Sequence, residues 1–393
     1  MPLLHPRELL AEVPWDVESK VLGGDLSLYV HVPFCVKKCL YCSFPSAPMG
    51  PLDEELYVDA LCSEITSWAG QLKGRKLFSL YVGGGTPSRL SCPAWKRVFG
   101  CLWRFFDPSD LQEVTFEANP ESLNISLLKT WMDLCPIPIR LSLGVQSFDD
   151  SDLLALGRPH TAKDAKRACD MALSEGLSLS LDIMFRLPNQ TIRGFAVTLR
   201  EAVKSGAEHL SAYELSIEDG TPYHSMNLSF CEDGYVFYRY LQWYLAKKGF
   251  LQYEISNFAL NGAFRLHNLR YWLGGEFLGV GPGAWSCIGG ARYRNASNLK
   301  GWARLVALSG KGVDFGEFIP NESRRSERAV LRLRTIWGFR PGLEDKRVAA
   351  SLSSLCDDLV QLNKDLDGSD VYRLTPRGFR VANRIWEMLL PDC

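Results

Sequence analysis

The sequence predicts an α/β protein built on a parallel sheet. Extended and helical segments alternate through the first two thirds of the 393 residues, and polar or glycine-rich groups follow five successive extended segments. Repeated strand–helix units with right-handed crossovers form an open doubly wound sheet or a complete or partial barrel, and the pattern leaves these arrangements open. In each of them the chemistry gathers at the carboxyl ends of the strands.

The elements are expected in the following order along the chain. Strands are predicted at 26–32, 77–83, 113–119, 139–146, 177–185 and 209–217. The clearest helix follows the first strand, where residues 51–72 begin with Pro and Asp and carry an apolar face formed by Leu56, Ala60, Leu61, Ile65 and Trp68. Further helices are expected at 93–106, 122–134, 163–175 and 192–204.

The pattern changes after residue 250, which suggests a division into four parts. We expect an N-terminal extension over 1–20, a core over 21–250, a Gly- and aromatic-rich extension over 251–315 and a C-terminal, mainly helical domain over 316–393. A short hairpin is expected in this last part, at "VYRLTPRGF" (371–379).

Composition excludes several classes of protein. The formal net charge is −1 with both signs interspersed, so no basic surface points to nucleic acid. The acidic first twenty residues match neither a signal peptide nor a transit peptide, and no apolar run reaches the roughly 18 residues of a spanning helix. A cytoplasmic protein is expected, in which twelve cysteines do not form a disulfide framework.

Three cysteines stand apart because they lie within eight positions, as C-x3-C-x2-C: Cys35, Cys39 and Cys42. A structural zinc site usually needs four ligands, and no second C-x2-C pair is present. Thioredoxin-like redox chemistry leaves Cys35 without a role. An iron–sulfur cubane uses all three thiolates and leaves one iron without a protein ligand, where a substrate or cofactor can bind.

Polar groups at the strand ends are the other candidates for a site. Gly84, Gly85 and Thr86 form a turn that lets backbone approach a ligand, although a plain strand-to-helix turn explains them equally well. Glu117 could bind an ammonium or hydroxyl group, or be a solvated acid. Gln146 offers a donor and an acceptor together, which suits a ribose or a carboxylate, and the Arg158 guanidinium suits a carboxylate. Asp182 lies between apolar neighbours, where burial without a partner is costly.

The motifs in combination resemble a known family. In order they are "YVHVPFCVKKCLYCSF", "YVGGGTPS", "FEANPES", "RLSLGVQSF", "LGRPH", "LSLDIMFRLP", "HLSAYELSIEDGTPY" and "HNLRYW". They look like the radical S-adenosylmethionine (SAM) superfamily and, within it, the coproporphyrinogen dehydrogenase group and its relative, the HemW heme chaperones. The resemblance covers nearly the whole chain.

The resemblance implies a fold and cofactors. The fold is a partial (β/α)6 TIM-like barrel with a C-terminal, mainly helical, winged-helix-like domain. A [4Fe-4S] cluster is expected on the three cysteines, with the open iron chelated by SAM. The SAM contacts implied are Tyr29, Gly84, Gly85, Thr86, Glu117, Gln146, Arg158 and Asp182.

Two features favour the chaperones over the dehydrogenases. Phe44 stands where the dehydrogenases carry a further cysteine. The motif associated with heme in the HemW family is present at His267, Asn268, Tyr271 and Trp272, although a structural His in an aromatic core explains the residues alone. Four residues depart from the usual HemW pattern: Arg265 replaces Cys, Trp285 replaces His, and Arg186 and Asn189 replace Gly.

The expected function is therefore a chaperone that holds a [4Fe-4S] cluster, SAM and heme and delivers heme to an acceptor hemoprotein. The alternative is oxygen-independent coproporphyrinogen III dehydrogenase, which decarboxylates two propionates by means of a 5'-deoxyadenosyl radical. SAM cleavage is expected to be feasible and the oxidase activity is not expected, so enzyme status stays open. A third reading is a binding module whose cluster stabilises the fold or passes electrons. A low-potential electron donor is implied, and a homodimer and peripheral membrane contact stay open.

Overall fold

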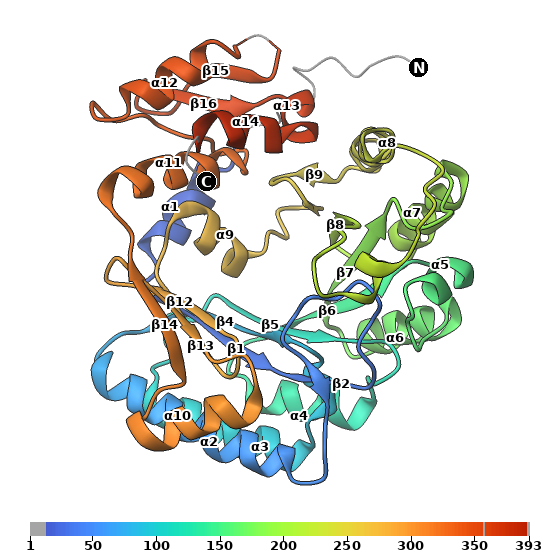
Figure 1. Cartoon of the computed structure of the whole chain (residues 1–393), viewed down its shortest axis with the longest axis vertical. Helices are drawn as coiled ribbons and strands as arrows, with labels where there is room; N and C mark the ends of the chain where they lie inside the picture. The colour runs from blue at the N-terminus through green and yellow to red at the C-terminus, as the bar shows by residue number, and fades with distance from the viewer. Residues whose placement is uncertain (1–12, 357, 391–393) are drawn as a thin grey trace.

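The computed structural model describes residues 13–356 and 358–390. Its main sheet has twelve strands within these residues, in the order β14-β13-β12-β11-β1-β4-β5-β6-β7-β8-β10-β9 (Figure 1). The parallel strands at its centre are β1 (Leu26–Val32), β4 (Leu77–Gly84), β5 (Glu113–Ala118), β6 (Ile139–Gln146), β7 (Ser178–Phe185) and β8 (His209–Glu214). Because these six neighbours follow chain order without reversal, the sheet is wound in one direction, as in a barrel, and the doubly wound alternative is wrong.

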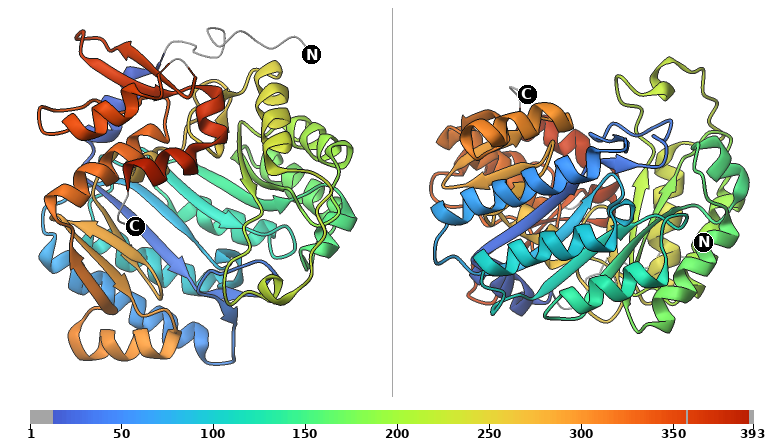
Figure 2. Two further views of the ribbon diagram at one scale, coloured as in Figure 1. Left: turned by 45° about the horizontal axis from the view of Figure 1, so that its top comes forward. Right: turned by 90° about the horizontal axis from the view of Figure 1, so that it is seen from below.

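The crossover helices cover the outer face of the curved sheet (Figure 2). They are α2 (Asp53–Gln71), α3 (Cys92–Phe105), α4 (Ile125–Leu134), α5 (Asp150–Ala155), α6 (Ala162–Ser174) and α7 (Ile192–Lys204). Aromatic side chains fill the space beneath them, where Phe116 stacks on Trp131 with ring centroids 4.4 Å apart. Single-turn 3-10 helices follow β4 and β8, at Pro87–Arg89 and Pro222–Ser225.

Local sequence signals set where the crossover helices begin. The side chains of Ser91, Asn124, Thr161 and Thr191 each accept a backbone N–H in the first turn of α3, α4, α6 and α7. Such caps satisfy donors that have no partner within the helix. The strands therefore end, and the helices start, close to the positions expected from the sequence.

The segment after residue 250 contains strands that the sequence analysis did not identify. At one edge of the sheet, β11 (Phe277–Val280) pairs with β1, and β12 (Trp285–Ile288), β13 (Ala291–Asn295) and β14 (Val313–Phe318) continue antiparallel. At the other edge lie β10 (Asn257–Ala259) and β9 (Leu251–Gln252), next to α8 (Gly234–Lys247). Helix α10 (Leu299–Ser309) packs on α2. Both edges of the barrel are thereby extended rather than joined, so the barrel stays open.

Helices α1 (Trp15–Gly23) and α9 (Leu266–Leu273) lie between the open barrel and the C-terminal segment (Figure 1). The buried carboxylate of Glu18 in α1 accepts hydrogen bonds from Arg332 and from both terminal nitrogens of Arg340, at 2.7 and 2.8 Å. This ion pair fastens the N-terminal helix to the C-terminal segment. Residues 1–12 of the expected extension lie outside the described residues, and its expected end at residue 20 falls inside α1.

The C-terminal segment combines helices with one hairpin. Its elements are α11 (Asn321–Leu333), α12 (Lys346–Ser353), β15 (Val360–Lys364), β16 (Asp370–Leu374), α13 (Pro376–Arg380) and α14 (Ala382–Leu389). The expected hairpin at 371–379 is misplaced, because the turn lies earlier, at the Asp-Gly pair before β16, and Thr375 caps α13 instead. The expected boundary at 316 falls within β14.

No helix among the described residues is both long enough and apolar enough to cross a lipid bilayer.

Candidate functional site

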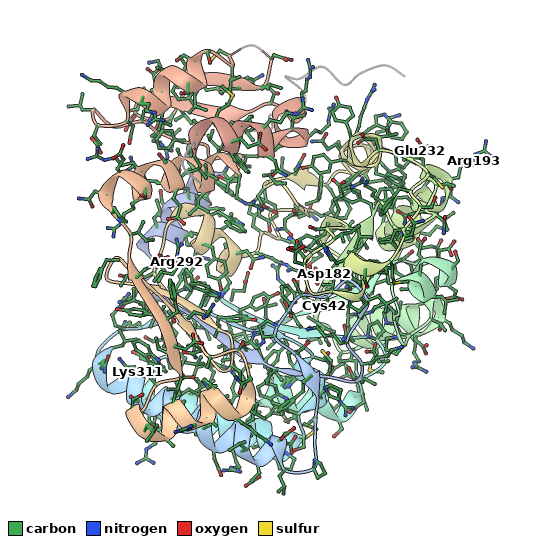
Figure 3. All side chains as sticks on the ribbon, viewed as in Figure 1. Cys42, Asp182, Arg193, Glu232, Arg292 and Lys311 are labelled. Carbon is green, nitrogen blue, oxygen red and sulfur yellow. The ribbon has the colours of Figure 1, made fainter. Side chains whose placement is uncertain are left out.

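A cavity of about 400 Å³ opens at the carboxyl ends of the parallel strands. The three cysteines of the loop after β1 line it, and so do residues at the ends of the next five strands, β4 to β8. Figure 3 shows Cys42 and Asp182 close together in this region. The sequence-predicted residues that line the cavity are Cys35, Cys39, Cys42, Gly84, Gly85, Thr86, Glu117, Gln146, Arg158 and Asp182. A volume of this size suits a small-molecule cofactor.

The cysteine loop presents free thiols to this cavity. Cys35 ends the two-residue strand β2 (Phe34–Cys35), which pairs with β3 (Ala47–Pro48) and so closes the loop at its base. Cys39 is buried, Cys35 and Cys42 are partly exposed, and none of the three forms a disulfide. Burial raises the pKa of the Cys42 thiol, so positive charge from a bound metal cluster would be needed to favour its thiolate.

The donor set fits a metal cluster rather than one ion. No group of three His, Cys, Asp or Glu side chains in the described part of the chain converges closely enough to hold a single metal ion. A cubane places each thiolate on a different iron, so its ligands do not need to converge on one point. Three soft sulfur donors on one loop, with no carboxylate or imidazole among them, match that requirement.

The glycine turn packs directly against the cysteine loop. Gly84 has a φ of +108°, and a Cβ at this position would lie 2.6 Å from a ring carbon of His31. A Cβ on Gly85 would lie 2.7 Å from the carbonyl oxygen of Phe34, and the Gly85 N–H donates to the carbonyl oxygen of Val32 at 2.7 Å. Both glycines are therefore required by the close approach of the two loops. This packing gives them a structural reason in addition to any ligand contact.

A chain of hydrogen bonds joins two of the cysteines. Thr86 Oγ1 donates to Cys35 Sγ at 3.7 Å and accepts from Asn119 Nδ2 at 2.9 Å. Asn119 Oδ1 accepts from Arg158 Nη2 at 2.7 Å, and Arg158 Nη1 donates to Cys39 Sγ at 3.4 Å. Donors of this kind favour the thiolate form of a metal ligand. Asn119 is the last residue of the expected strand 113–119, but nothing in the sequence around it indicates this linking role.

Arg158 supplies fixed positive charge to the cavity. Burial lowers the pKa of its guanidinium, but Tyr41, Cys39 and Glu121 outweigh this effect and raise it, so the group stays charged. Nη2 also donates to the carbonyl oxygen of Gly144 at 2.9 Å, whereas the buried Nε has no protein partner. A guanidinium held in this way suits an anionic group such as a carboxylate.

Two carboxylates lie on neighbouring parts of the cavity wall. Burial raises the pKa of Glu117 to about 7, although its oxygens accept from Tyr81 Oη at 2.6 Å and from the Gly84 N–H at 3.0 Å. Asp182 accepts from Ser142 Oγ at 3.1 Å and pairs with Arg265 at 3.3 Å. Arg265, one of the four departures from the family pattern, is therefore the buried partner of a cavity residue.

Gln146 ends β6 in a left-handed conformation, with a φ of +64°, where the pairing with β7 shifts register. A non-glycine residue in this region costs of order 1 kcal/mol or more, and such strain concentrates at functional sites. The same backbone geometry accounts for the glycines that the family usually carries at two further positions. Arg186 and Asn189 have φ values of +56° and +60°, so glycine would fit both positions without strain.

Tyr29 does not line the cavity, unlike the other residues for which SAM contacts were expected. Its hydroxyl lies 2.9 Å from His31 Nδ1, and its ring lies 6.0 Å from that of Tyr81. His31 in turn contacts the carbonyl oxygen of Pro45 at 3.0 Å. Tyr29 is therefore linked to the cysteine loop through His31.

The H-N-x-x-Y-W residues form α9 and lie apart from the cavity. His267 is fully buried, with Nδ1 2.9 Å from Ser79 Oγ and Nε2 2.7 Å from Tyr271 Oη. Both ring nitrogens are thus occupied, and burial lowers the pKa of the imidazole to about 3. As arranged here His267 has no position for an iron, so the expected heme ligation needs α9 to rearrange. Asn268 and Trp272 are half-buried, and Arg334 covers one face of the Trp272 ring.

Trp285, the remaining departure, also lies outside the cavity. It is 40% exposed on β12, in a cross-strand row with Arg294 and Phe315. The Arg294 guanidinium stands 5.8 Å from the Trp285 ring and 5.6 Å from that of Phe315. The row is a surface feature rather than part of the site.

Comparisons with known proteins concern the family and the fold of this chain. The family model of the Radical SAM superfamily matches residues 29–202. Heme chaperone HemW from Escherichia coli (strain K12) is 36% identical over 380 residues, covering 93% of this chain and 98% of that protein. Heme chaperone HemW from Bacillus subtilis (strain 168) is 32% identical over 380 residues, covering 93% and 99%. Among solved structures, the radical SAM enzyme coproporphyrinogen III oxidase (HemN) from Escherichia coli superposes with a TM-score of 0.79 at 22% identity, covering 95% and 92%.

Proposed function

Because the chain belongs to the HemW heme chaperone family of radical SAM proteins, we propose that it binds a [4Fe-4S] cluster, SAM and heme and delivers heme to an acceptor hemoprotein. The observation that carries the cofactor half of the proposal is the cavity in which three cysteines meet the glycine turn, two carboxylates and Arg158. When bound, the cluster and SAM supply one-electron reductive chemistry.

Each polar group of the cavity has a proposed role in this binding. Cys35, Cys39 and Cys42 hold three irons and leave the fourth open to SAM. Arg158 orients the SAM carboxylate, which its unpartnered Nε and fixed charge favour. Glu117 accepts from the SAM ammonium beside the glycine turn, and that cation offsets the burial of the carboxylate.

The remaining cavity side chains are proposed to face the nucleoside. Gln146 offers both a donor and an acceptor, and Asp182 offers acceptor oxygens for ribose hydroxyls. Lys37 and Lys38 are exposed on the cysteine loop and line the cavity mouth, which leaves the cluster accessible to a low-potential electron donor. We place this function in the cytoplasm, where thiols that bind a cluster stay reduced.

Heme handling is favoured over porphyrin synthesis by one residue in the cysteine loop. Phe44 lines the cavity mouth and is 62% exposed, at the position where the resembling dehydrogenases carry a further cysteine. The HemN likeness concerns the fold, which the two activities share. For heme we propose α9, provided that His267 gives up its contact with Ser79 or Tyr271 on binding.

The test uses anaerobically reconstituted protein and separates the cofactors. Cys35→Ala, Cys39→Ala and Cys42→Ala should each abolish the cluster, whereas Cys231→Ala, at an exposed position away from the cavity, should keep full iron and sulfide. SAM should perturb the EPR spectrum of the wild-type cluster. A cysteine variant with a complete cluster would contradict the assignment.

Heme is tested in a second experiment. Heme should give a Soret shift with the wild-type protein, and His267→Ala should change that spectrum if α9 rearranges. Turnover of coproporphyrinogen III to protoporphyrinogen in proportion to protein would contradict the chaperone proposal. An unchanged Soret spectrum in His267→Ala would show that His267 does not ligate heme and that the heme site lies outside α9.

A further inference from the structure

We propose that Arg265 is a positioning residue that fixes the carboxylate of Asp182 toward SAM bound in the cavity. This inference rests on the proposed SAM site and goes beyond it, because Arg265 does not line the cavity. The residue acts through Asp182 from the interior of the barrel. Arg265 directly precedes α9, so this segment also contributes a side chain to the support of the site.

The contacts of Arg265 hold Asp182 from one side. Arg265 is 1% exposed, and its Nη2 contacts Asp182 Oδ1 at 3.3 Å, Ser142 Oγ at 2.5 Å and Ser180 Oγ. Ser142 Oγ donates to the other carboxylate oxygen, Oδ2, at 3.1 Å. Both oxygens of Asp182 are thus engaged from the interior, and each keeps acceptor capacity for a ligand hydroxyl on the cavity side.

The backbone at Arg265 is itself fixed by other elements. The Arg265 N–H donates to Tyr253 Oη at 3.1 Å. The next two N–H groups, of Leu266 and His267, donate to the carboxylate of Glu113 on β5 at 2.9 and 3.2 Å. Glu113 therefore caps the start of α9, which has no side-chain cap of its own. A guanidinium anchored in this way has little freedom to move, so it can define the orientation of its partner.

The charge of Arg265 also affects the second carboxylate of the cavity. After the larger effect of burial, Asp182 raises the pKa of Glu117, and Arg265 lowers it. Two carboxylates close together in a buried site tend to share a proton unless a cation lies nearby. Arg265 supplies a cation of this kind, and it offsets part of the effect of burial on the pKa of Glu117.

A double-mutant cycle distinguishes positioning from simple support of the fold. The variants are Arg265→Met, Asp182→Asn and the double variant, and the measurements are the equilibrium dissociation constant for SAM, the iron and sulfide content, and Tm. Arg270→Met is the matched control, because Arg270 is also buried in α9 but donates to the backbone carbonyls of Val21 and Asp25.

We expect Arg265→Met to weaken SAM binding about tenfold or more with a complete cluster, since it removes the cationic partner of the partly buried Asp182 carboxylate. The double variant should bind within about twofold of Asp182→Asn, because coupled residues are not additive. Arg270→Met should lower Tm and leave SAM affinity unchanged. Should Arg265→Met not fold, Arg265→Lys retains the charge without the fork geometry and should show an intermediate loss.

Unchanged SAM affinity in Arg265→Met or Arg265→Lys would overturn the inference, and so would effects of Arg265→Met and Asp182→Asn that multiply. These results leave the SAM site itself intact. A wild-type protein with a complete cluster that does not bind SAM would instead overturn the proposed function, and this inference with it.

Discussion

Asn119→Ala should weaken SAM binding without removing the cluster. Asn119 accepts a hydrogen bond from Arg158 and connects this guanidinium to Thr86. A hydrogen bond to a charged group contributes about 1.5–3 kcal/mol. If that loss appears entirely in the orientation of Arg158 toward the SAM carboxylate, the dissociation constant should rise about 10- to 150-fold.

The assay is an anaerobic SAM titration followed by EPR, with iron and sulfide measured on the same sample. Asn124→Ala is the control, since Asn124 caps α4 and does not line the cavity. It should lower the free energy of unfolding by about 1 kcal/mol and leave SAM affinity unchanged. An Asn119→Ala protein with a complete cluster and wild-type SAM affinity would refute the role given to the hydrogen-bond chain.

Three further predictions concern pH, a buried carboxylate and a strained turn. The pKa of Glu117 is raised to about 7, and the SAM ammonium binds the carboxylate form better than the neutral acid. SAM affinity should therefore rise with pH from about 5.5 to 7.5 and level off above that. Glu117→Gln should flatten this pH profile, and a flat profile in the wild-type protein would contradict the role given to Glu117. Glu64 is fully buried, and its carboxylate accepts hydrogen bonds from donors on Gly281, Asn295, Trp302 and Gly312. Glu64→Ala leaves these donors without their partner, so it should lower the free energy of unfolding, measured in urea, by about 3–5 kcal/mol. A loss below about 1 kcal/mol would show that these hydrogen bonds contribute little to stability. Asn189 has a positive φ, which alanine tolerates poorly and glycine adopts freely. Asn189→Ala should therefore lower the free energy of unfolding by about 1 kcal/mol, whereas Asn189→Gly should not lower it. Equal losses in the two variants would exclude backbone strain as the cause.

The central strands were predictable because their signals are local. The six expected strands and the five expected crossover helices occur in order, since each strand is a short apolar run and most of the helices begin at a polar cap. Strands β11 to β14 were missed because their residues mix glycine, charged and aromatic types. β11 forms by parallel pairing with β1, which lies about 250 residues earlier, and β12 to β14 then pair antiparallel in succession.

The residues of the candidate site were also predictable where their sequence signals are local. The cysteine spacing, the glycine turn and the rim residues are contiguous motifs, and the order of the strands brings them to one cavity. Tyr29 is the exception, since it lies next to His31 instead of on the cavity wall. Asn119 was recognised only as a strand end, because its partners Thr86 and Arg158 are 33 and 39 residues away.

The sequence by itself determined the family, and it identified the three cysteines and most of the other residues that line the cavity, because these depend on residue type and short spacing. Only the tertiary structure decided what α9 does. It buries His267 between Ser79 and Tyr271, and it shows that Arg265, 83 residues from Asp182 in the chain, is the partner of that carboxylate. Burial and long-range pairing depend on how segments that are distant in the chain pack together in three dimensions. A local pattern of residues does not specify which distant segment a residue will contact.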